Sequence, residues 1–351
     1  MRRALHRAAI AVATSATAAS CTAAQDDLED LPKHVLAHTS IYFRHGARAP
    51  VHVAMPGQDH VVWDDCDREA CARLRRPSSL CPLSDLSGSG APPRSKVDEK
   101  QQSHRLPGGC HAGELTLTGT QQAHRLGQLL RERYASLLQP AAGEDADVAS
   151  RITVRSTNVS RCVLTARAVL AGLVGDTSPS PIAIRTVRNE DEDLTPAAAR
   201  CARLAELWDE ARHEWRDDAN SMHRSMPRVT EHLRRVMGEE AFEAYGIDEG
   251  RWVPLKDVLY AIGALPSRPP LPWNISPDLL KEVNALAGAQ VGHMMGEGRS
   301  MRYQAEVTLT LTLTSGRGTP AKRRRHGITW HERAYHEQRY TELPTLPPTL
   351  C

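Results

Sequence analysis

The sequence predicts a helix-rich α/β fold, and three observations support this prediction. Short apolar, β-prone segments alternate along the chain with longer segments whose apolar residues recur at helical spacing. Alanine, arginine and leucine, which favour helices, are abundant, whereas aromatic residues make up only 4% of the composition. The 351 residues are enough for one large domain with a substantial insertion.

Three short segments are predicted to be strands. Residues 36–43 are apolar and rich in residues that favour strands. Ile152 and Val154 alternate with polar neighbours, and residues 182–187 form a third apolar stretch. These segments would supply the sheet of the α/β fold.

Three longer segments are predicted to be helices. The first begins with a capping box made by Thr118 and Gln121, and its apolar residues recur at helical spacing as far as Leu137. The second covers residues 160–173, and the polar side chains just before it could cap its N-terminus. The third covers residues 277–295 and follows a proline-rich loop.

Other segments depart from this alternation, within a domain that we expect to span residues 25–305. Residues 55–113 are rich in Pro, Gly, Ser and Cys and are predicted to form a long insertion. Residues 197–262 are charged, have helical propensity and are predicted to form a helical cap. Residues 306–351 are predicted to be a divergent, largely unstructured tail, although Val307 to Thr314 alternates Leu or Val with Thr, as a strand would.

The first 24 residues have the composition of a targeting peptide. Arg2, Arg3 and Arg7 precede a short apolar run, and no acidic residue occurs before Asp26. This pattern predicts a cleavable secretory signal, and therefore a protein that is secreted or lies in the endomembrane lumen. A mitochondrial presequence, which is also rich in arginine and poor in acids, is the alternative.

Four of the eight cysteines crowd into the insertion: Cys66, Cys71, Cys81 and Cys110. In a secreted chain they indicate a loop held by two disulfides, and the spacing leaves their pairing open. A zinc site is the weaker interpretation, because the spacings do not match paired C-x-x-C motifs. Cys162, inside the second predicted helix, is expected to be a small buried apolar residue.

The charge and hydropathy of the chain argue against two classes of partner. The 44 Lys and Arg residues are balanced by 42 Asp and Glu, whereas a nucleic-acid-binding protein would have a lopsided basic charge. No segment beyond the N-terminus is long enough and apolar enough to span a membrane. We therefore expect neither nucleic acid binding nor a membrane span.

Residues 44–50, Arg-His-Gly-Ala-Arg-Ala-Pro, follow directly after the first predicted strand. Two arginines flank a histidine, and a guanidinium group matches phosphate oxygens with paired hydrogen bonds. A neutral histidine held between them could attack phosphorus. A surface turn with incidental charge explains the segment poorly, because three basic residues within five positions repel one another unless an anion lies between them.

A second basic segment, Arg155-Ser156-Thr157-Asn158, lies where the second strand leads into the second helix. Arg155 could add a third guanidinium group to a phosphate clamp. The helix N-terminus would add N–H groups and a favourable dipole. Taken alone, such a segment would more often be an ordinary capped helix start.

With these motifs the chain resembles the histidine acid phosphatases, which form branch 2 of the histidine phosphatase superfamily. Residues 44–50 match the family's Arg-His-Gly-x-Arg-x-Pro signature, and Arg155-Ser156-Thr157 with Arg161 matches its second motif. Within the family, the chain looks like the lysophosphatidic acid phosphatase type. Weaker similarity is found at residues 115–134 and 264–273, and the resemblance extends from about residue 36 to residue 302.

The resemblance implies a mixed core sheet flanked by helices, with a smaller, mostly helical cap and with the last part of the core missing. Arg44, Arg48 and Arg155 would bind the substrate phosphate, and His45 would accept the phosphoryl group before water releases it. No cofactor and no metal would be needed, because the arginines neutralise the phosphate. The substrate would be a small phosphomonoester, and a lysophospholipid, a phosphosugar or an aryl ester would each be compatible.

One part of the family pattern is missing from this sequence. The family places a His-Asp pair after a later core strand, and its aspartate protonates the leaving oxygen, but no His-Asp dipeptide occurs in this chain. The general acid is therefore unassigned, and its loss would cost a factor on the order of 10²–10⁴ in rate. The acidic run Glu190, Asp191, Glu192 and Asp193 is typical of a solvated face, although one of its carboxylates could face the pocket.

Three interpretations of the whole chain follow. The first is an active acid phosphatase whose gene end, as written, is truncated or misread. The second is a catalytically impaired protein that still binds phosphorylated ligands on the same fold. The third, a phosphotransferase or mutase of the same superfamily, is disfavoured by Pro50 and by the signal-like start of the chain.

Overall fold

The protein is described by a computed structural model that covers residues 36–52, 55–138, 147–175, 179–192, 194, 201–222, 225–295 and 309–314. Contacts divide the chain into two units, Met1–Ala37 and His38–Cys351, and every described helix and strand belongs to the second. The predicted targeting peptide, residues 1–24, lies outside the described residues.

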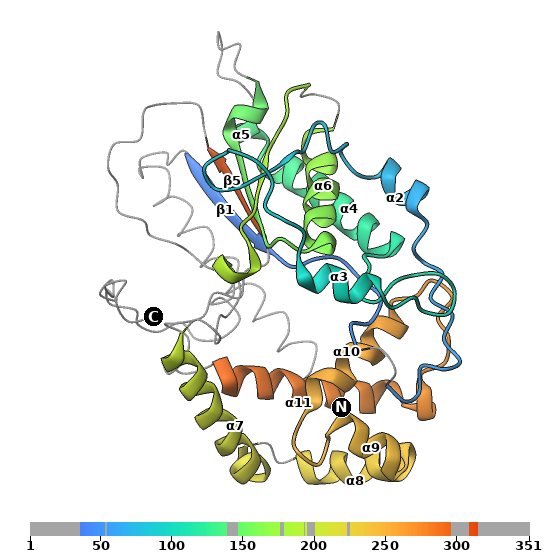
Figure 1. Cartoon of the computed structure of the whole chain (residues 1–351). Helices are drawn as coiled ribbons and strands as arrows, with labels where there is room; N and C mark the ends of the chain where they lie inside the picture. Colours follow the sequence, from blue (N-terminus) through green and yellow to red (C-terminus); the bar gives the residue numbers. More distant parts are fainter. Residues whose placement is uncertain are drawn as a thin grey trace, which may run out of the picture. The chain divides into compact units, whose positions relative to one another are not determined.

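Five strands form one mixed sheet: β1 (His38–Phe43), β2 (Leu83–Ser84), β3 (Ile152–Ser156), β4 (Ile184–Arg185) and β5 (Leu309–Thr314). Their order in the sheet is β1-β5-β3-β4-β2. β5 is antiparallel to both of its neighbours, whereas β4 is parallel to β3 and to β2. Figure 1 shows β1 and β5 side by side. The predicted α/β fold with a mixed sheet is therefore confirmed.

β5 lies between β1 and β3 and sets their relative position. Phe43 at the end of β1 and Ser156 at the end of β3 both pair with Leu309. β1 and β3 consequently run in the same direction, and their C-terminal ends are level at one edge of the sheet. The predicted unstructured tail over residues 306–351 does not hold for β5, where the Leu-Thr alternation forms a strand; the rest of that tail lies outside the described residues.

The helices have these bounds: α2 (Arg68–Arg73), α3 (Lys96–Gln102), α4 (Leu117–Arg133), α5 (Ala135–Leu138), α6 (Ser160–Val174), α7 (Ala202–Met222), α8 (Met226–Met237), α9 (Glu239–Tyr245), α10 (Trp252–Gly263) and α11 (Pro277–Met295). Short 3-10 turns occur at η1 (Val148–Arg151), η2 (Asn189–Asp191) and η3 (Pro272–Asn274). None of the described helices is long and apolar enough to cross a bilayer.

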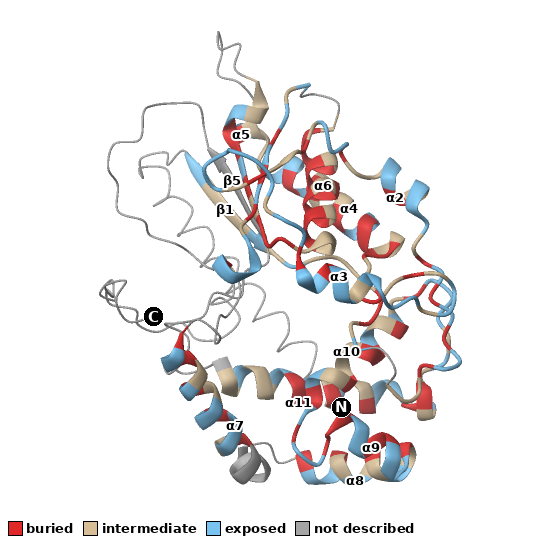
Figure 2. Ribbon diagram, in the orientation of Figure 1, coloured by how far each residue is buried: buried red, intermediate tan, exposed pale blue. Residues whose placement is uncertain are grey.

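α4 and α6 pack against each other and against one face of the sheet. Ile152 and Val154 of β3 point into this core, while Thr153 between them is exposed. In Figure 2 the buried residues of α6 form a nearly continuous red band. The two helices approach closely because Gly127 and Gly172 have no side chain at the contact; a Cβ atom on Gly172 would lie 2.0 Å from the carbonyl oxygen of His124.

The caps of these two helices differ from the sequence prediction. α4 is capped by Thr116, whose hydroxyl accepts the Gly119 N–H at 3.0 Å, rather than by the predicted box at Thr118. The N–H of Thr118 donates instead to Asp65, at 3.1 Å. The cap residue of α6 is Val159, which supplies no side-chain cap. A residue from the insertion, Asp98, caps this helix instead, as described below.

A second core is formed by α7 to α11. It contains large side chains that are almost fully buried, among them Trp215, Phe242, Tyr245 and Trp252. Leu286 of α11 belongs to the same core. The helical region predicted for residues 197–262 therefore extends further along the chain, through α11.

The insertion at residues 55–113 has structure of its own. It contains α2 and α3, and it supplies the edge strand β2. A disulfide joins Cys66 to Cys110, while Cys71 and Cys81 are buried free thiols. The insertion therefore has one disulfide, not the two predicted.

Candidate active site

The loop after β1 is held against α4 and α6 by backbone contacts. Gly46 and Gly119 lie so close that a Cβ atom on Gly46 would be 2.2 Å from the Gly119 carbonyl oxygen. The Gly46 N–H donates to Thr165 Oγ1 at 3.3 Å, and the Ala47 N–H donates to Gln122 Oε1 at 3.0 Å. These contacts fix the position of His45 relative to both helices.

His45 is partly buried, and one of its ring nitrogens is already engaged. Nδ1 lies 2.9 Å from the carbonyl oxygen of Gly46. Because a carbonyl oxygen only accepts hydrogen bonds, we assign the ring proton to Nδ1. Nε2 of the neutral ring then carries the lone pair that a nucleophile needs.

The surroundings of His45 favour its neutral form. Burial is the largest effect on the pKa of His45, the hydrogen bond to Gly46 opposes it, and the nearby charges of Arg48, Arg161 and Arg44 act in the same direction as burial; together they lower the pKa from the ordinary 6.5 to about 4. The ring therefore remains unprotonated in mildly acidic solution, where an ordinary histidine would be charged.

Arg48 is mostly buried and forms an ion pair with a residue of α10, one of the helices of the second core. Its Nη2 donates to Asp257 Oδ1 at 2.7 Å, and its Nη1 donates to Asp257 Oδ2 at 3.2 Å. Asp257 lies on α10 and was not identified from the sequence. In the sequence, Asp257 stands out as the single acid of an otherwise largely apolar helix. No pattern of neighbouring residues, however, links it to Arg48.

Arg155 is also held by a carboxylate. Its Nη2 donates to Glu192 Oε1 at 2.8 Å, and both side chains are largely buried. Glu190 and Asp191 are exposed, as predicted for a solvated face, and Asp193 lies outside the described residues. Glu192 differs from that prediction, because it turns inward to Arg155.

The sheet brings the candidate residues to one edge. His45 follows the C-terminal end of β1, and Arg155 lies next to the end of β3, which is level with it. Arg44 is exposed, yet its charge acts on the His45 ring. Arg161, a member of the second motif that was not predicted to bind phosphate, lies in the first turn of α6, and its charge acts on the same ring. The C-terminal edge of parallel strands is the usual place for a ligand in α/β proteins.

The site is thus a neutral histidine beside several guanidinium groups, which suits a phosphate group. The sequence profile of the histidine phosphatase superfamily (branch 2) matches residues 36–244. The chain therefore belongs to this superfamily, and the resemblance noted from its motifs is confirmed.

Individual relatives carry phosphatase names. Lysophosphatidic acid phosphatase type 6 of Bos taurus is 30% identical over 241 residues, which cover 67% of this chain and 52% of the relative. Testicular acid phosphatase of Homo sapiens is 28% identical over 204 residues, which cover 56% of this chain and 45% of the relative. The chain spans about half the length of the curated relatives it matches. The crystal structure of Klebsiella sp ASR1 phytase aligns with a TM-score of 0.41 and 16% identity, covering 75% of this chain and 61% of that one.

Proposed function

We propose that this chain hydrolyses phosphate monoesters by way of a phosphoryl group carried on His45. The observation that carries the proposal is the state of the His45 ring, whose Nδ1 faces the Gly46 carbonyl and whose pKa is lowered to about 4. The phosphatase names of its relatives support the same chemistry.

The reaction would proceed in two displacements. In the first, the Nε2 lone pair of His45 forms a bond to phosphorus, and the ester P–O bond breaks, so that the leaving oxygen departs with the electron pair and takes up a proton. In the second, a water oxygen attacks the same phosphorus, the N–P bond breaks, and inorganic phosphate leaves. Arg44, Arg48 and Arg155 would neutralise the charge on the phosphoryl oxygens.

Replacing the nucleophile tests this proposal directly. We expect His45→Ala to lower the hydrolysis of 4-nitrophenyl phosphate by a factor on the order of 10³ or more. His52→Ala is the matched control, because His52 is an exposed histidine a few residues further along the same loop. Full activity in the His45→Ala variant would rule the proposal out.

The substrate and the compartment belong to the proposal as well. Lysophosphatidic acid is one ester to assay, since it appears in the name of a relative. A secreted or lumenal protein, or alternatively a mitochondrial one, follows from the N-terminal composition alone. Expression of the full chain with a C-terminal tag, followed by fractionation, would distinguish these locations.

A second function, binding of phosphorylated ligands without turnover, is favoured by one observation. The sequence contains no His-Asp dipeptide, the motif in which the family places its proton donor. In that case titration calorimetry would detect binding of inorganic phosphate to the chain. An activity assay with phosphate esters would detect no release of phosphate. An active chain without a general acid would instead hydrolyse alkyl esters more slowly than 4-nitrophenyl phosphate, by a factor on the order of 10²–10⁴.

A further inference from the structure

Two tripeptides in the sequence have the Asn-x-Ser pattern that accepts N-linked sugars: Asn158-Val159-Ser160 and Asn274-Ile275-Ser276. Neither has proline at its middle position, which would prevent modification. An N-linked glycan is bulky and polar, so a folded protein carries it at the surface. The positions of the two asparagine side chains therefore decide which tripeptide can be modified in the folded protein.

Asn158 lies inside the fold. Only 7% of it is exposed, and its Nδ2 donates to the carbonyl oxygen of Pro93 at 2.8 Å. Asp98 accepts from the backbone N–H of Ser160 at 2.9 Å and from its hydroxyl at 2.7 Å, so this carboxylate caps α6. A glycan on Asn158 would need space that the packed chain occupies, so a chain modified there could not reach this fold.

Asn274 lies at the surface, in the loop between α10 and α11. The residue is exposed, and its side-chain amide forms no hydrogen bond with any other described residue. The next residue, Ile275, is buried in the second core and anchors the loop. Ser276 is exposed, and its hydroxyl accepts the Leu279 N–H at 3.2 Å, as a helix cap does. A glycan on Asn274 would extend into solvent without displacing any of these contacts.

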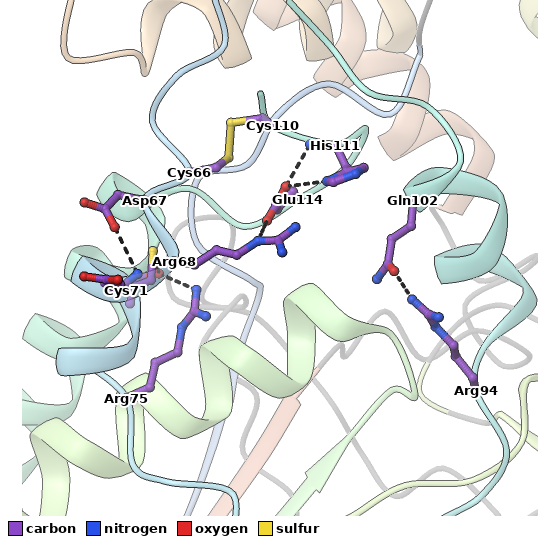
Figure 3. Close-up of polar contacts among 12 residues, drawn as sticks. Cys66, Asp67, Arg68, Cys71, Arg75, Arg94, Gln102, Cys110, His111 and Glu114 are labelled. Carbon is purple, nitrogen blue, oxygen red and sulfur yellow. Dashed lines mark hydrogen bonds and ion pairs between the residues drawn. A yellow bond between two sulfur atoms is a disulfide. The ribbon is translucent and has the colours of Figure 1, made fainter. Parts of the chain in front are cut away.

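The disulfide between Cys66 and Cys110, drawn in Figure 3, is typical of the compartment in which this modification occurs. Disulfides form and persist in the lumen of the endoplasmic reticulum and outside the cell, and they are rare in the cytosol. The N-terminal composition, which predicts a secretory signal, points to the same compartment independently. A chain that enters this lumen meets the transferase that attaches N-linked sugars.

We propose that Asn274 carries an N-linked glycan and that Asn158 does not. The modification goes beyond the proposed phosphatase activity and rests on the proposed secretory location. In the transfer, Asn274 Nδ2 forms a bond to the anomeric carbon of a lipid-linked oligosaccharide and loses a proton. The bond from that carbon to the lipid diphosphate breaks, and the diphosphate leaves with the electron pair. The transfer precedes folding of the loop, because the Ser276 hydroxyl that the transferase recognises is engaged afterwards as the cap of α11.

Expression of the full chain in cultured mammalian cells tests the proposal. The purified protein would be treated with peptide N-glycosidase F, which removes N-linked glycans and converts each modified asparagine to aspartate. We expect the treatment to lower the apparent mass of the wild-type chain in a single step. When the digestion is carried out in heavy-oxygen water, peptide mass spectrometry should find the isotope at position 274 and none at position 158.

Four variants assign the site. Asn274→Gln and Ser276→Ala should each abolish the change in mass, because the first removes the acceptor nitrogen and the second removes the recognised hydroxyl. Ser276→Thr keeps a hydroxyl and should retain the change. Asn284→Gln is the matched control, because Asn284 lies on α11 outside either tripeptide, and it should retain the change as well.

Three results would overturn the proposal: a wild-type chain whose mass the treatment does not alter, an isotope label at Asn158, or a change in mass that persists in Asn274→Gln. The measurement needs no hydrolysis of a phosphate ester. Its failure is therefore distinguishable from failure of the proposed phosphatase function.

Discussion

At the scale of single residues, the environment of His45 acts on its ring in two ways. The contact with the Gly46 carbonyl places the proton on Nδ1, which leaves the lone pair of the neutral ring on Nε2. Burial, together with the charges of neighbouring arginines, lowers the pKa of the ring to about 4. The two effects together keep the lone pair available under acidic conditions.

The pH dependence of catalysis should follow from this shift. Because the neutral ring attacks, kcat/KM should be sustained above the pKa of His45 and should fall as the pH drops through about 4. The measurement is kcat/KM for 4-nitrophenyl phosphate across the acid range, corrected for ionisation of the substrate. A fall that already begins near the ordinary value of 6.5 would show that burial does not shift this group.

The candidate basic residues of the site could be grouped from the sequence, but the carboxylates that hold them could not. Arg44, His45 and Arg48 occur within one short motif, so local spacing was enough to group them. Asp257 lies 209 positions from Arg48, and only the packing of α10 against the loop joins them. Glu192 looked like its solvated neighbours, because the direction of a side chain within an acidic run depends on the fold.

At the scale of secondary structure elements, the close contact between α4 and the loop carrying His45 depends on a glycine. A Cβ atom on Gly119 would lie 2.0 Å from the carbonyl oxygen and 2.6 Å from the nitrogen of Ala47. Backbone atoms cannot move aside as the end of a flexible side chain can. The loop would have to shift as a whole, and His45 with it.

Gly119→Ala should therefore weaken both the fold and the site. We expect a loss of about 2–3 kcal/mol in the free energy of unfolding, together with reduced phosphatase activity in the protein that remains folded. Gly288→Ala on α11 is the matched control, because its Cβ atom would meet nothing within 4 Å. There alanine should stabilise the helix by up to about 1 kcal/mol. Equal thermal denaturation of the two variants would refute the argument.

The bounds of the helices were predicted more accurately than their caps. The third predicted helix, over residues 277–295, coincides with α11, and the second matches α6 to within one residue. The helical spacing of their apolar residues is a local pattern and can therefore be recognised in the sequence. The caps were not readable, because Asp65 and Asp98 reach the helix starts from the insertion.

At the scale of the whole molecule, β5 joins the two strands that carry the site. Leu311 pairs with Ile41 of β1 and with Val154 of β3, so its backbone lies in the middle of the sheet. The composition that follows this strand, with its basic run and scattered prolines, led to the prediction of a disordered tail. The alternation of Leu and Thr correctly indicated a strand. The position of this strand in the sheet could not be predicted, because it depends on pairing with β1 and β3, which lie far away in the sequence.

A proline in this strand should disrupt the sheet. Leu311→Pro removes a backbone donor from a central strand, and we expect it to lower the free energy of unfolding by at least about 2 kcal/mol. His38→Pro is the matched control, because it lies at the first residue of β1, at the edge of the described sheet, where proline is tolerated. Denaturant titration of both variants would test this, and a harmless Leu311→Pro would exclude β5 from the fold.

The central claim, that His45 carries the phosphoryl group, is tested most directly by trapping the intermediate. The full chain would be mixed with a radiolabelled phosphomonoester, quenched within the first turnover, and digested to locate the label. We expect label on His45 that is stable to alkali and labile to acid, and none in the His45→Ala variant. Label at the same level in that variant, or hydrolysis of the ester without any trapped label, would contradict the claim.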